Sequence, residues 1–451
     1  MPEKNTSPLP LSFRDDLLER VLADLRAGEC CSLIGTSGTG KSNIARFLRR
    51  QDVQHFYWKD DRTWVILIDS HSLIFDNEQK AEYVITELMI QGVIEEAENH
   101  SFSDEFLTRA NQLYDRLIDH PGIHVALRTL RDLCKRLCGK DNLQLIFAFD
   151  QFENIWQTLD ASFFLNLRNL RDQFKYQVVY LVMIRDRLQR MRQDSQAVES
   201  FWELFSAHTY GLGPYSERDA FTMVERLASR AQVDVSNIAQ EIVRLSGGHP
   251  GILRAVFWAF RDSSRKTFSV DELLQIASVS EECEKVWNSL SSNEQHLCQI
   301  IVQGLLLHHP NSETLNDLQI KGISSGDPPI LFSPLFATYI LQKTESNLSG
   351  IMVDIRHREI WLDGQLLQHP FTPLEFRLLE CLAHRVGDIC KREDLLHELY
   401  GETYYDKSDQ RLYAILTRVR EALGEDARNP RYLITHRGGL QLTKGGIIND
   451  R

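Results

Sequence analysis

The chain has 451 residues, of which 43% are hydrophobic and 25% are charged, as in ordinary globular proteins. This length predicts about three domains. The net charge of −12 argues against nucleic-acid binding by the surface as a whole, so any such function requires a local basic patch.

No apolar stretch approaches the roughly 18–20 residues of a membrane-spanning helix. The N-terminal residues are polar and lack the apolar core of a signal peptide, so we expect a cytoplasmic protein with no membrane partner. The eight cysteines are scattered, and no pair is completed by a second pair or a His couple at zinc-binding spacing. We therefore expect reduced thiols, most of them packed in the interior.

Residues 35–42 read Gly-Thr-Ser-Gly-Thr-Gly-Lys-Ser and fit G-x-x-x-x-G-K-[ST] at every fixed position. The apolar run 31–34 predicts a buried strand before this loop, and residues 43–48 predict a helix after it. The three glycines allow backbone N–H groups to surround a phosphate, and the helix N-terminus adds its positive dipole end. The sequence therefore predicts binding of ATP or GTP. The residues expected to bind the nucleotide are Gly35, Thr36, Ser37, Gly38, Thr39, Gly40, Lys41 and Ser42.

Within this site, Lys41 is expected to reach the β- and γ-phosphates, and the Ser42 hydroxyl to hold Mg²⁺. The apolar run 143–150 predicts a strand ending in Asp150, which would lie beside the phosphate loop and help to hold Mg²⁺. Glu153 is placed to orient or deprotonate the attacking water.

Two further apolar, β-branched runs, 63–69 and 178–184, predict additional strands of a parallel sheet. The second run ends in Arg185, for which we predict a γ-phosphate sensor role with a surface ion pair as the alternative. The candidate catalytic residues are Lys41, Asp150, Glu153 and Arg185.

These motifs, with Gly211-Leu212-Gly213-Pro214 and the 245–250 stretch Leu-Ser-Gly-Gly-His-Pro, resemble the STAND class of signalling NTPases, relatives of the AAA+ ATPases. The resemblance covers about residues 10–270. It implies ATP as the nucleotide, slow hydrolysis, a helical lid opened at Pro214, and a nucleotide- or interface-facing His249. A packed core position is an equal alternative for His249. At 13–16 the chain lacks the Gly of the family's Gly-Arg motif, so no base contact is assigned to Arg14.

The predicted fold is an α/β P-loop NTPase, a parallel sheet with flanking helices, followed by a helical lid and two winged-helix domains. The NTPase core spans 1–210, with a charged helical insertion at about 85–140, and the lid spans 211–272.

The first winged helix spans 273–345. There, Ser291 to Glu294 form a capping-box pattern opening a helix with Leu297, Ile300, Ile301 and Leu305 on one face. A second helix over 313–321 and strands over 329–332 and 335–340 are expected next. Because its second helix carries only Lys321 as a base, a structural or coupling role is predicted.

The second winged helix spans 350–445. Runs 352–355 and 359–362 predict a hairpin, and Thr372, Pro373 and Glu375 predict a capped helix start. A helix near 391–400 and another over 408–423 follow. The last helix places Leu412, Leu416, Val419 and Leu423 on one face and Gln410, Arg411, Thr417, Arg418 and Glu421 on the other. Residues 432–442 predict a β-ribbon.

This segment resembles the OmpR/PhoB-type winged-helix DNA-binding domain through Gly364, residues 372–376, Arg418-Val419-Arg420-x-x-Leu423-Gly424, and Thr435-x-Arg437-Gly438. The resemblance implies that the third helix enters the major groove and the wing Arg the minor groove. The DNA-binding candidates are Arg411, Thr417, Arg418 and Arg437. Between 411 and 437 there are six Arg against three acidic residues, the local basic patch that phosphate contacts require.

The predicted function is an ATP-dependent molecular switch that binds double-stranded DNA, a prokaryotic transcription regulator controlled by nucleotide state. We expect homo-oligomerisation on activation and an unidentified protein or ligand trigger. One alternative is an oligomeric, DNA-dependent AAA+-like ATPase of the loader or transposition type, with an arginine finger from among Arg187, Arg190 and Arg192. Another is an antiviral STAND defence sensor whose terminal domain binds a protein.

Overall fold

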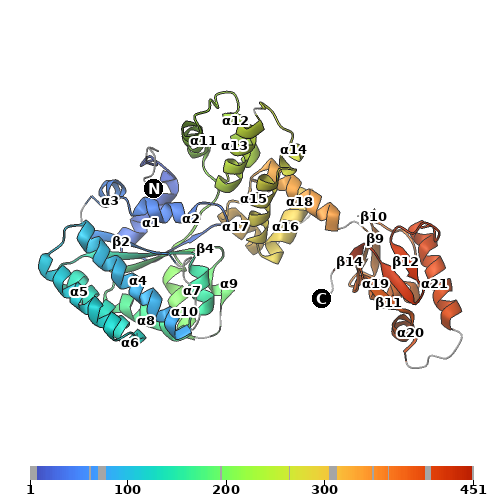
Figure 1. Cartoon of the computed structure of the whole chain (residues 1–451), viewed down its shortest axis with the longest axis horizontal. Helices are drawn as coiled ribbons and strands as arrows, with labels where there is room; N and C mark the ends of the chain where they lie inside the picture. Colours follow the sequence, from blue (N-terminus) through green and yellow to red (C-terminus); the bar gives the residue numbers. More distant parts are fainter. Residues whose placement is uncertain are drawn as a thin grey trace. The chain divides into compact units, whose positions relative to one another are not determined.

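The computed structural model describes residues 8–59, 62–69, 78–192, 194, 196–263, 265–303, 312–347, 350–363, 365–401 and 408–448. The chain divides into two compact units, residues 1–338 and 339–451, and each is described by itself (Figure 1). The division falls within the helix α18 (Pro334–Asn347). Among the described residues, no helix combines the length and hydropathy needed to cross a membrane.

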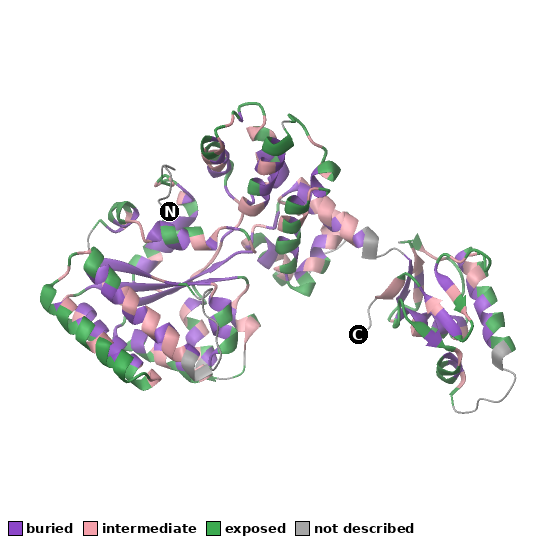
Figure 2. Cartoon of the chain, in the orientation of Figure 1, coloured by how far each residue is buried: buried purple, intermediate pink, exposed green. Residues whose placement is uncertain are grey.

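The first unit is built on a five-stranded parallel sheet with the order β2-β3-β4-β1-β5. Its strands are β1 (Cys31–Ile34), β2 (Thr63–Asp69), β3 (Gln144–Asp150), β4 (Val178–Ile184) and β5 (Thr209–Gly211). Every residue of β1 and β4 is buried, as the purple strands in Figure 2 show. Apolar runs of this kind form strands that are covered on both faces. The four strands predicted from the sequence are confirmed.

Helices flank this sheet, and the loop after β1 leads directly into the second of them. The elements up to β5 are α1 (Asp15–Arg26), α2 (Lys41–Leu48), α3 (Gln51–Trp58), α4 (Glu78–Asn99), α5 (Asp104–Asp119), α6 (Ile123–Cys134), the π-helix η1 (Lys135–Lys140), α7 (Phe152–Thr158), α8 (Ala161–Gln173), α9 (Leu188–Met191), α10 (Gln196–Trp202) and the 3₁₀-helix η2 (Glu203–Phe205). The insertion predicted at about 85–140 is helical, as expected, and comprises α4, α5, α6 and η1. Helix α4 packs along the edge strand β2 and against α6.

The part of the first unit that directly follows β5 is helical. The next helices are α11 (Glu217–Ala231), α12 (Ala239–Ser246), α13 (Pro250–Ser263), α14 (Val270–Leu274) and α15 (Ala277–Asn288). Helices α11, α12 and α13 pack on one another, and α15 packs on α13. The segment predicted as a lid is therefore helical, and its movement as a lid stays a prediction.

The predicted first winged helix contains α16 (Ser292–Val302), α17 (Ser312–Ile320) and a short antiparallel pair, β6 (Ser324–Ser325) with β7 (Ile330–Leu331). The capping box of Ser291 and Glu294 is present, which confirms the predicted helix start. Leu305 lies outside the described residues. The strand predicted over 335–340 is wrong, because this segment belongs to helix α18. The Ser333 side chain accepts a hydrogen bond from the Phe336 N–H at 3.2 Å, and Pro334 occupies the first helical position, so Ser-Pro starts a helix here rather than separating two strands.

After α18, the described residues of the second unit form two small sheets and three helices. One sheet has the order β10-β9-β8-β14 and the other the order β11-β13-β12. Their strands are β8 (Ile351–Asp354), β9 (Glu359–Leu362), β10 (Gln365–Leu366), β11 (Ile389–Lys391), β12 (Leu433–His436), β13 (Gly439–Leu442) and β14 (Gly445–Ile448). The helices are α19 (Pro373–Ala383), α20 (Arg392–Tyr400) and α21 (Ser408–Leu423). The predicted helices and hairpins are confirmed, including the Thr372–Glu375 capping box. Gly364 lies outside the described residues.

Strand β14 was not predicted from the sequence. It pairs in parallel with β8, with Gly445 opposite Ile351 and Ile447 opposite Val353. The end of this unit is thereby joined to its beginning, and one hydrophobic core extends over both sheets and all three helices. The second unit consequently has a core of its own.

Candidate nucleotide site and DNA-binding surface

The loop between β1 and α2 has the backbone shape that phosphate binding requires. Gly38 and Gly40 have φ angles of 79° and 89°, in the left-handed region that favours glycine. Helix α2 begins at Lys41, so its first N–H groups lack partners within the helix. Thr39 Oγ1 donates to the Thr36 carbonyl at 2.9 Å, while the buried Thr36 Oγ1 has no hydrogen-bond partner among the described residues. All eight predicted loop residues lie in this loop or in the first turn of α2, and the arrangement fits the phosphates of a nucleotide.

Lys41 is folded back onto its own loop. Its Nζ atom donates to the carbonyl oxygens of Gly35 at 2.5 Å and Thr36 at 2.9 Å, and the side chain is buried. Bound phosphates would replace these carbonyls as partners of the ammonium group. Ser42 is the second residue of α2, where its hydroxyl would face a metal ion held by the phosphates.

The charges near Lys41 come from separate parts of the first unit. Burial lowers the pKa of Lys41 to about 8. The carboxylates of Glu153 and Asp150 oppose this effect, whereas the positive charges of Arg185 and Lys321 add to it. The fold therefore brings together the four candidate catalytic residues, and it adds Lys321, which sequence analysis placed in a different module.

Asp150 and Glu153 occupy the carboxyl edge of the sheet. Asp150 ends β3 and accepts a hydrogen bond from the Gln151 N–H at 3.0 Å. Gln151 takes a left-handed conformation with φ 52°, which turns the chain into α7 and places Glu153 in its first turn. Arg185 follows β4, and its Nε lies 2.8 Å from Oε1 of the buried Glu153. The ion pair considered for Arg185 is thus present, and its role as a γ-phosphate sensor stays a prediction.

His249 is fully buried against the phosphate loop. A Cβ atom added to Gly38 would lie 3.0 Å from His249 Cε1, and the Phe332 ring lies 5.6 Å from the imidazole ring between centroids. Burial lowers the pKa of His249 to about 3, and the nearby positive charge of Arg14 contributes to the lowering. The imidazole is therefore neutral at physiological pH. It packs beside the loop, and a direct contact with nucleotide stays a prediction.

Arg14 is a residue of the site to which sequence analysis assigned no role. Its guanidinium donates to the carbonyl oxygens of Thr39 at 3.1 Å and Gly213 at 3.0 Å, and reaches that of Pro214 at 3.5 Å. Its own N–H donates to Asp219 at 3.1 Å. Arg14 thus joins the phosphate loop to the turn at Pro214. The only sequence signal for this role is that Arg14 lies near the family's Gly-Arg position. The residues that Arg14 contacts lie about 25 and 200 residues away along the chain, so no local pattern reveals them.

The end of α17 lies beside the nucleotide site. A Cβ atom on Gly211 would lie 1.7 Å from the Ile320 carbonyl oxygen, so only glycine allows this approach. The next residue, Lys321, is 1% exposed, and its Nζ lies 2.7 Å from Glu294 Oε1 and 3.6 Å from Asp186 Oδ1. Lys321 is therefore a buried ion-pair residue that joins α16 and α17 to the segment after β4.

On the C-terminal unit, α21 has the two faces that its sequence predicted. The apolar face is buried, with exposed fractions of 6% or less, and consists of Leu412, Ile415, Leu416, Val419 and Leu423. The opposite face is exposed and contains Gln410, Arg411, Thr417, Arg418 and Glu421.

The four DNA-binding candidates differ in what they contact. Arg418 Nε donates to the buried carboxylate of Glu375 at 2.6 Å, which ties α21 to the start of α19. Thr417 Oγ1 donates to the Tyr413 carbonyl within the helix. Arg411 and Arg437 are exposed, and within the described part of the chain neither makes an ion pair. Arg411 and Arg437 are thus the candidates best able to reach a phosphate or base edge, and the DNA contacts of all four stay predictions.

Comparison with protein-family models finds matches on both units. The model described as "Novel STAND NTPase 1" matches residues 13–327, more than half of the chain. The chain belongs to this STAND NTPase family. The model described as "Transcriptional regulatory protein, C terminal" matches residues 368–439, in agreement with the OmpR/PhoB-type winged helix seen in the second unit.

Curated relatives cover a smaller part of this STAND NTPase. The regulatory protein VanR of Enterococcus faecium is 30% identical over 87 residues, which are 19% of this chain and 37% of VanR. The transcriptional regulatory protein KdpE of Mycobacterium tuberculosis is 31% identical over 98 residues, which are 22% of this chain and 42% of KdpE. The chain therefore spans less than half of the length of these relatives.

Two solved structures are similar to portions of this chain. A Walker-type ATPase of Pyrococcus abyssi covers 74% of this chain and 99% of its own, with 17% identity and a TM-score of 0.44. The DNA-binding domain of Klebsiella pneumoniae RstA, in complex with the RstA box, covers 21% of this chain and 93% of its own, with 27% identity and a TM-score of 0.20.

The candidate arginine fingers of this STAND NTPase are all engaged within the chain. Arg187 Nε lies 3.3 Å from Oδ1 of the buried Asp317, and Arg190 forms an ion pair with the other oxygen of the same carboxylate. Arg192 pairs with Asp194 at 2.8 Å. A role for any of them toward a second subunit would first require these pairs to open.

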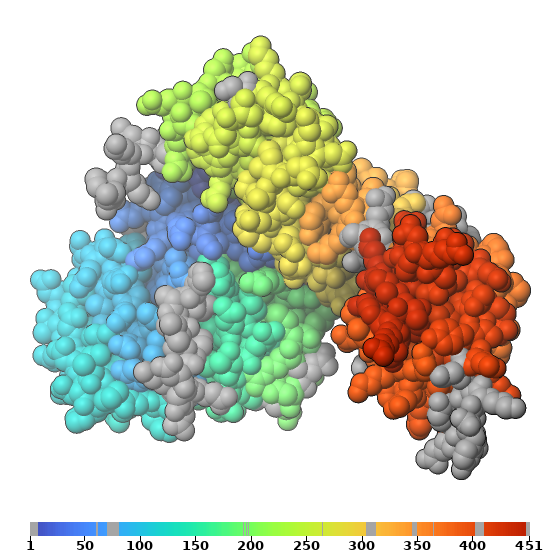
Figure 3. Space-filling view, turned by 45° about the vertical axis from the view of Figure 1, so that its right-hand side comes forward, coloured from blue at the N-terminus to red at the C-terminus, as the bar shows by residue number. Residues whose placement is uncertain are grey.

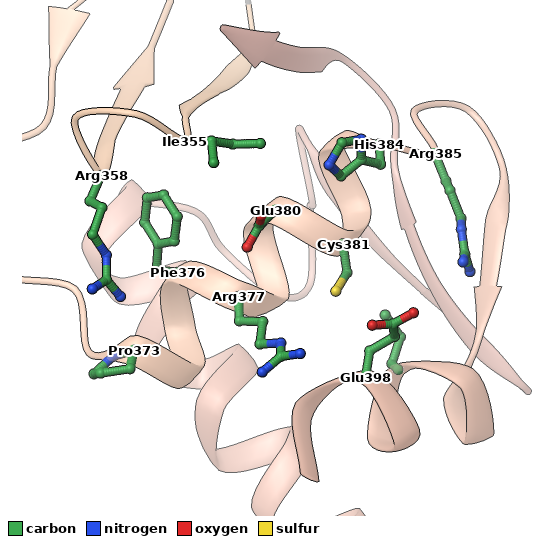
Figure 4. Close-up of a pocket in the computed structure, with 11 residues that line it drawn as sticks. Ile355, Arg358, Pro373, Phe376, Arg377, Glu380, Cys381, His384, Arg385 and Glu398 are labelled. Carbon is green, nitrogen blue, oxygen red and sulfur yellow. The ribbon is translucent and has the colours of Figure 1, made fainter. Parts of the chain in front are cut away.

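The C-terminal unit also has a hollow of about 650 Å³ between α19, α20 and the turn after β8 (Figure 4). The residues lining it are Ile355, Arg358, Pro373, Phe376, Arg377, Glu380, Cys381, His384, Arg385, Leu395 and Glu398. None of the four DNA-binding candidates lines this hollow.

Proposed function

We propose that this STAND NTPase is an ATP-dependent switch that binds double-stranded DNA through its OmpR/PhoB-type domain and regulates transcription. The observation that carries the proposal is the combination, in one chain, of a complete phosphate-loop site with a winged helix whose third helix exposes Arg411. The family description of the matched C-terminal domain and the names of VanR and KdpE support a regulatory role.

In the proposed switch, the backbone N–H groups of the phosphate loop and Lys41 would hold the nucleotide phosphates. Ser42 and Asp150 would hold Mg²⁺, whose charge would offset that of the phosphates. Glu153 would orient the attacking water or accept its proton. Because Arg185 already pairs with Glu153, the carboxylate is restrained, which favours slow turnover suited to a timer.

The proposed coupling runs through α17. Lys321 at its end and Asp317 within it are bonded to residues that directly follow β4, next to the phosphate loop. A change in the number of bound phosphates would act on these charges first. The OmpR/PhoB-type domain follows in the chain. It would respond either by becoming more or less exposed or by assembly of several copies of the protein on DNA. Assembly raises the effective concentration of each domain near the DNA, which would compensate for the few basic contacts of a single domain.

The second candidate, an oligomeric DNA-dependent ATPase, is less favoured by the structure. Its arginine finger would have to come from groups that are paired inside this chain, with Asp317 and Asp194 as partners. The family match to a STAND NTPase also favours a switch.

The proposal is tested by measuring binding of the full chain to duplex fragments from the region upstream of its own gene. Binding is measured with ATP, ADP or no nucleotide and over a series of salt concentrations. Lys41→Ala is expected to remove the effect of nucleotide, and Arg411→Ala to weaken specific binding by about 1–3 kcal/mol and lower the salt slope by about 0.9. Arg377→Ala is the matched control, because this exposed arginine lines the hollow on α19.

Arg418→Ala is a poorer test, since it also removes the bond to Glu375 that holds α21 in place. Site-selective binding that ignores the nucleotide would contradict the switch. Binding without sequence preference that accelerates ATP turnover would instead favour the DNA-dependent ATPase. Absence of DNA binding would make the last domain a protein-binding module.

A further inference from the structure

A cavity of about 420 Å³ opens in the helical insertion, between α5, α6 and the π-helix η1. Figure 1 shows α5 and α6 beside α4, the helix that packs on β2, and in the space-filling view the insertion forms the cyan surface of the first unit (Figure 3). None of the residues that line the cavity belongs to the nucleotide site. The lining residues are Glu105, Phe106, Arg109, Ala110, Leu113, Asp132, Leu133, Lys135, Arg136 and Lys140.

The floor of the cavity is apolar. Phe106, Ala110 and Leu133 are buried, with exposed fractions of 4%, 0% and 2%, and Leu113 is half-buried beside them. The volume lies within the range of about 300–1,000 Å³ that is usual for small-molecule sites. The cavity therefore has the size and the floor to hold the apolar body of a small ligand.

The rim of the cavity is positive. Four basic residues face two acidic ones, and of the basic residues Arg136 is paired with Asp141 at 3.0 Å. Within the described part of the chain, Arg109, Lys135 and Lys140 have no ion-pair partner. The two lining carboxylates, Glu105 and Asp132, also lack an ion-pair partner there, so these groups together leave one net positive charge at the rim, which attracts a ligand that carries a negative charge.

The π-helix explains why Lys135 and Lys140 both line the cavity. The Asp141 N–H donates to the Arg136 carbonyl at 3.2 Å, the five-residue spacing of a π-turn. In an α-helix of about 3.6 residues per turn, positions 135 and 140 would lie on different faces. The wider π-turn returns position 140 toward the face of position 135. Such turns are rare and occur frequently at functional sites.

We propose that this cavity is a binding site for a small organic anion, one with a compact apolar body and a single carboxylate, sulfonate or phosphate group. The body would lie on Phe106 and Leu133, and the anionic group would lie between Lys135 and Lys140, with Arg109 on the opposite wall. The binding proposal does not depend on the proposed function of the protein. If both hold, this site is an input of the switch.

The test uses the full chain and two fluorescent probes of the same ring system. One is 1-anilinonaphthalene-8-sulfonate, and the other is N-phenyl-1-naphthylamine, which lacks the sulfonate. The wild type is expected to bind one sulfonate probe per chain, and to bind it at least about tenfold more tightly than the neutral probe, because a charge-assisted contact is worth this factor or more. The double variant Lys135→Gln/Lys140→Gln is expected to remove the preference while still binding the neutral probe.

The matched control is Arg128→Gln/Arg131→Gln, which removes two exposed cations of α6 that do not line the cavity. It is expected to leave the preference unchanged. Leu113→Trp, which fills the cavity, is expected to abolish binding of both probes, and thermal melting followed by circular dichroism shows whether each variant is folded. Equal affinities in the wild type, a preference that survives in the lysine double variant, or binding that survives in a folded Leu113→Trp would overturn the proposal.

Discussion

At the scale of the residue, Lys41 is the position where burial and function oppose each other most directly. The phosphate loop needs an ammonium group, yet the fold buries the side chain and leaves it two backbone carbonyls as hydrogen-bond partners. Burial lowers its pKa to about 8, despite the opposing carboxylates of Glu153 and Asp150. Part of the ammonium charge is thus lost in the free protein at mildly alkaline pH.

Nucleotide affinity is consequently expected to fall as the pH rises. Bound phosphates favour the charged form of Lys41, so its pKa is higher in the complex than the value of about 8 in the free protein. Above that pH, binding must take up a proton, and the affinity for Mg-ADP should decrease by up to about tenfold per pH unit. Titrations of a fluorescent ADP analogue between pH 7 and 9.5 measure this slope. Lys41→Met is the control, and an equal slope in that variant would show that another group titrates.

At the scale of the element, α17 is fixed by charge rather than by apolar contact alone. Asp317 is 3% exposed and receives both Arg187 and Arg190 from the segment after β4. Arg190 also reaches Glu313 on the same helix at 2.7 Å, but this carboxylate is 74% exposed. Both acidic residues of α17 therefore contact Arg190, but Asp317 does so in the protein interior and Glu313 at the solvent-exposed surface.

Asp317→Asn is expected to lower the free energy of unfolding of the first unit by about 2 kcal/mol. This is less than the roughly 3–5 kcal/mol for a fully buried pair, because the two arginines are partly exposed. Glu313→Gln, the matched control, should change it by no more than about 0.5 kcal/mol, since exposed pairs are screened by water. Urea unfolding followed by circular dichroism measures both values. Equal losses in the two variants would mean that the Asp317 pair contributes nothing beyond a surface contact.

At the scale of the whole molecule, the chain consists of two compact units. The second unit has a single core of its own, closed by the pairing of β14 with β8. The proposed nucleotide site lies wholly in the first unit. Ligand binding stabilises only the structure that contains the site.

Calorimetry of the full chain is therefore expected to show two unfolding transitions. Mg-ADP should raise the temperature of one of them, by an amount that increases with ligand concentration, and leave the other unchanged. Lys41→Ala should reduce the increase. A single transition that shifts as a whole with Mg-ADP would show that the two units unfold together.

Much of the fold was predictable because its signals are local. The phosphate loop, the strand ends at Asp150 and Arg185, and the caps at Ser291 and Thr372 are each contained in a few neighbouring residues, and all are present in the structure. The prediction at 335–340 was wrong because an apolar run is compatible with a strand or a buried helix. There the Ser333 cap and Pro334 start α18 instead.

The sequence by itself determined the family, the phosphate loop with its lysine, and the two-faced third helix of the C-terminal domain, because each depends on residue types at short spacing. Only the tertiary structure decided that Arg14 bonds to the phosphate loop, that Asp317 pairs with two candidate arginine fingers, and that Arg418 is held by Glu375. The physical reason is that these are contacts of charged side chains with groups far from them in the chain, a backbone carbonyl for Arg14 and carboxylates for the other arginines. Many oxygen atoms could have been the partner of any one arginine until the packing of strands and helices brought particular groups together.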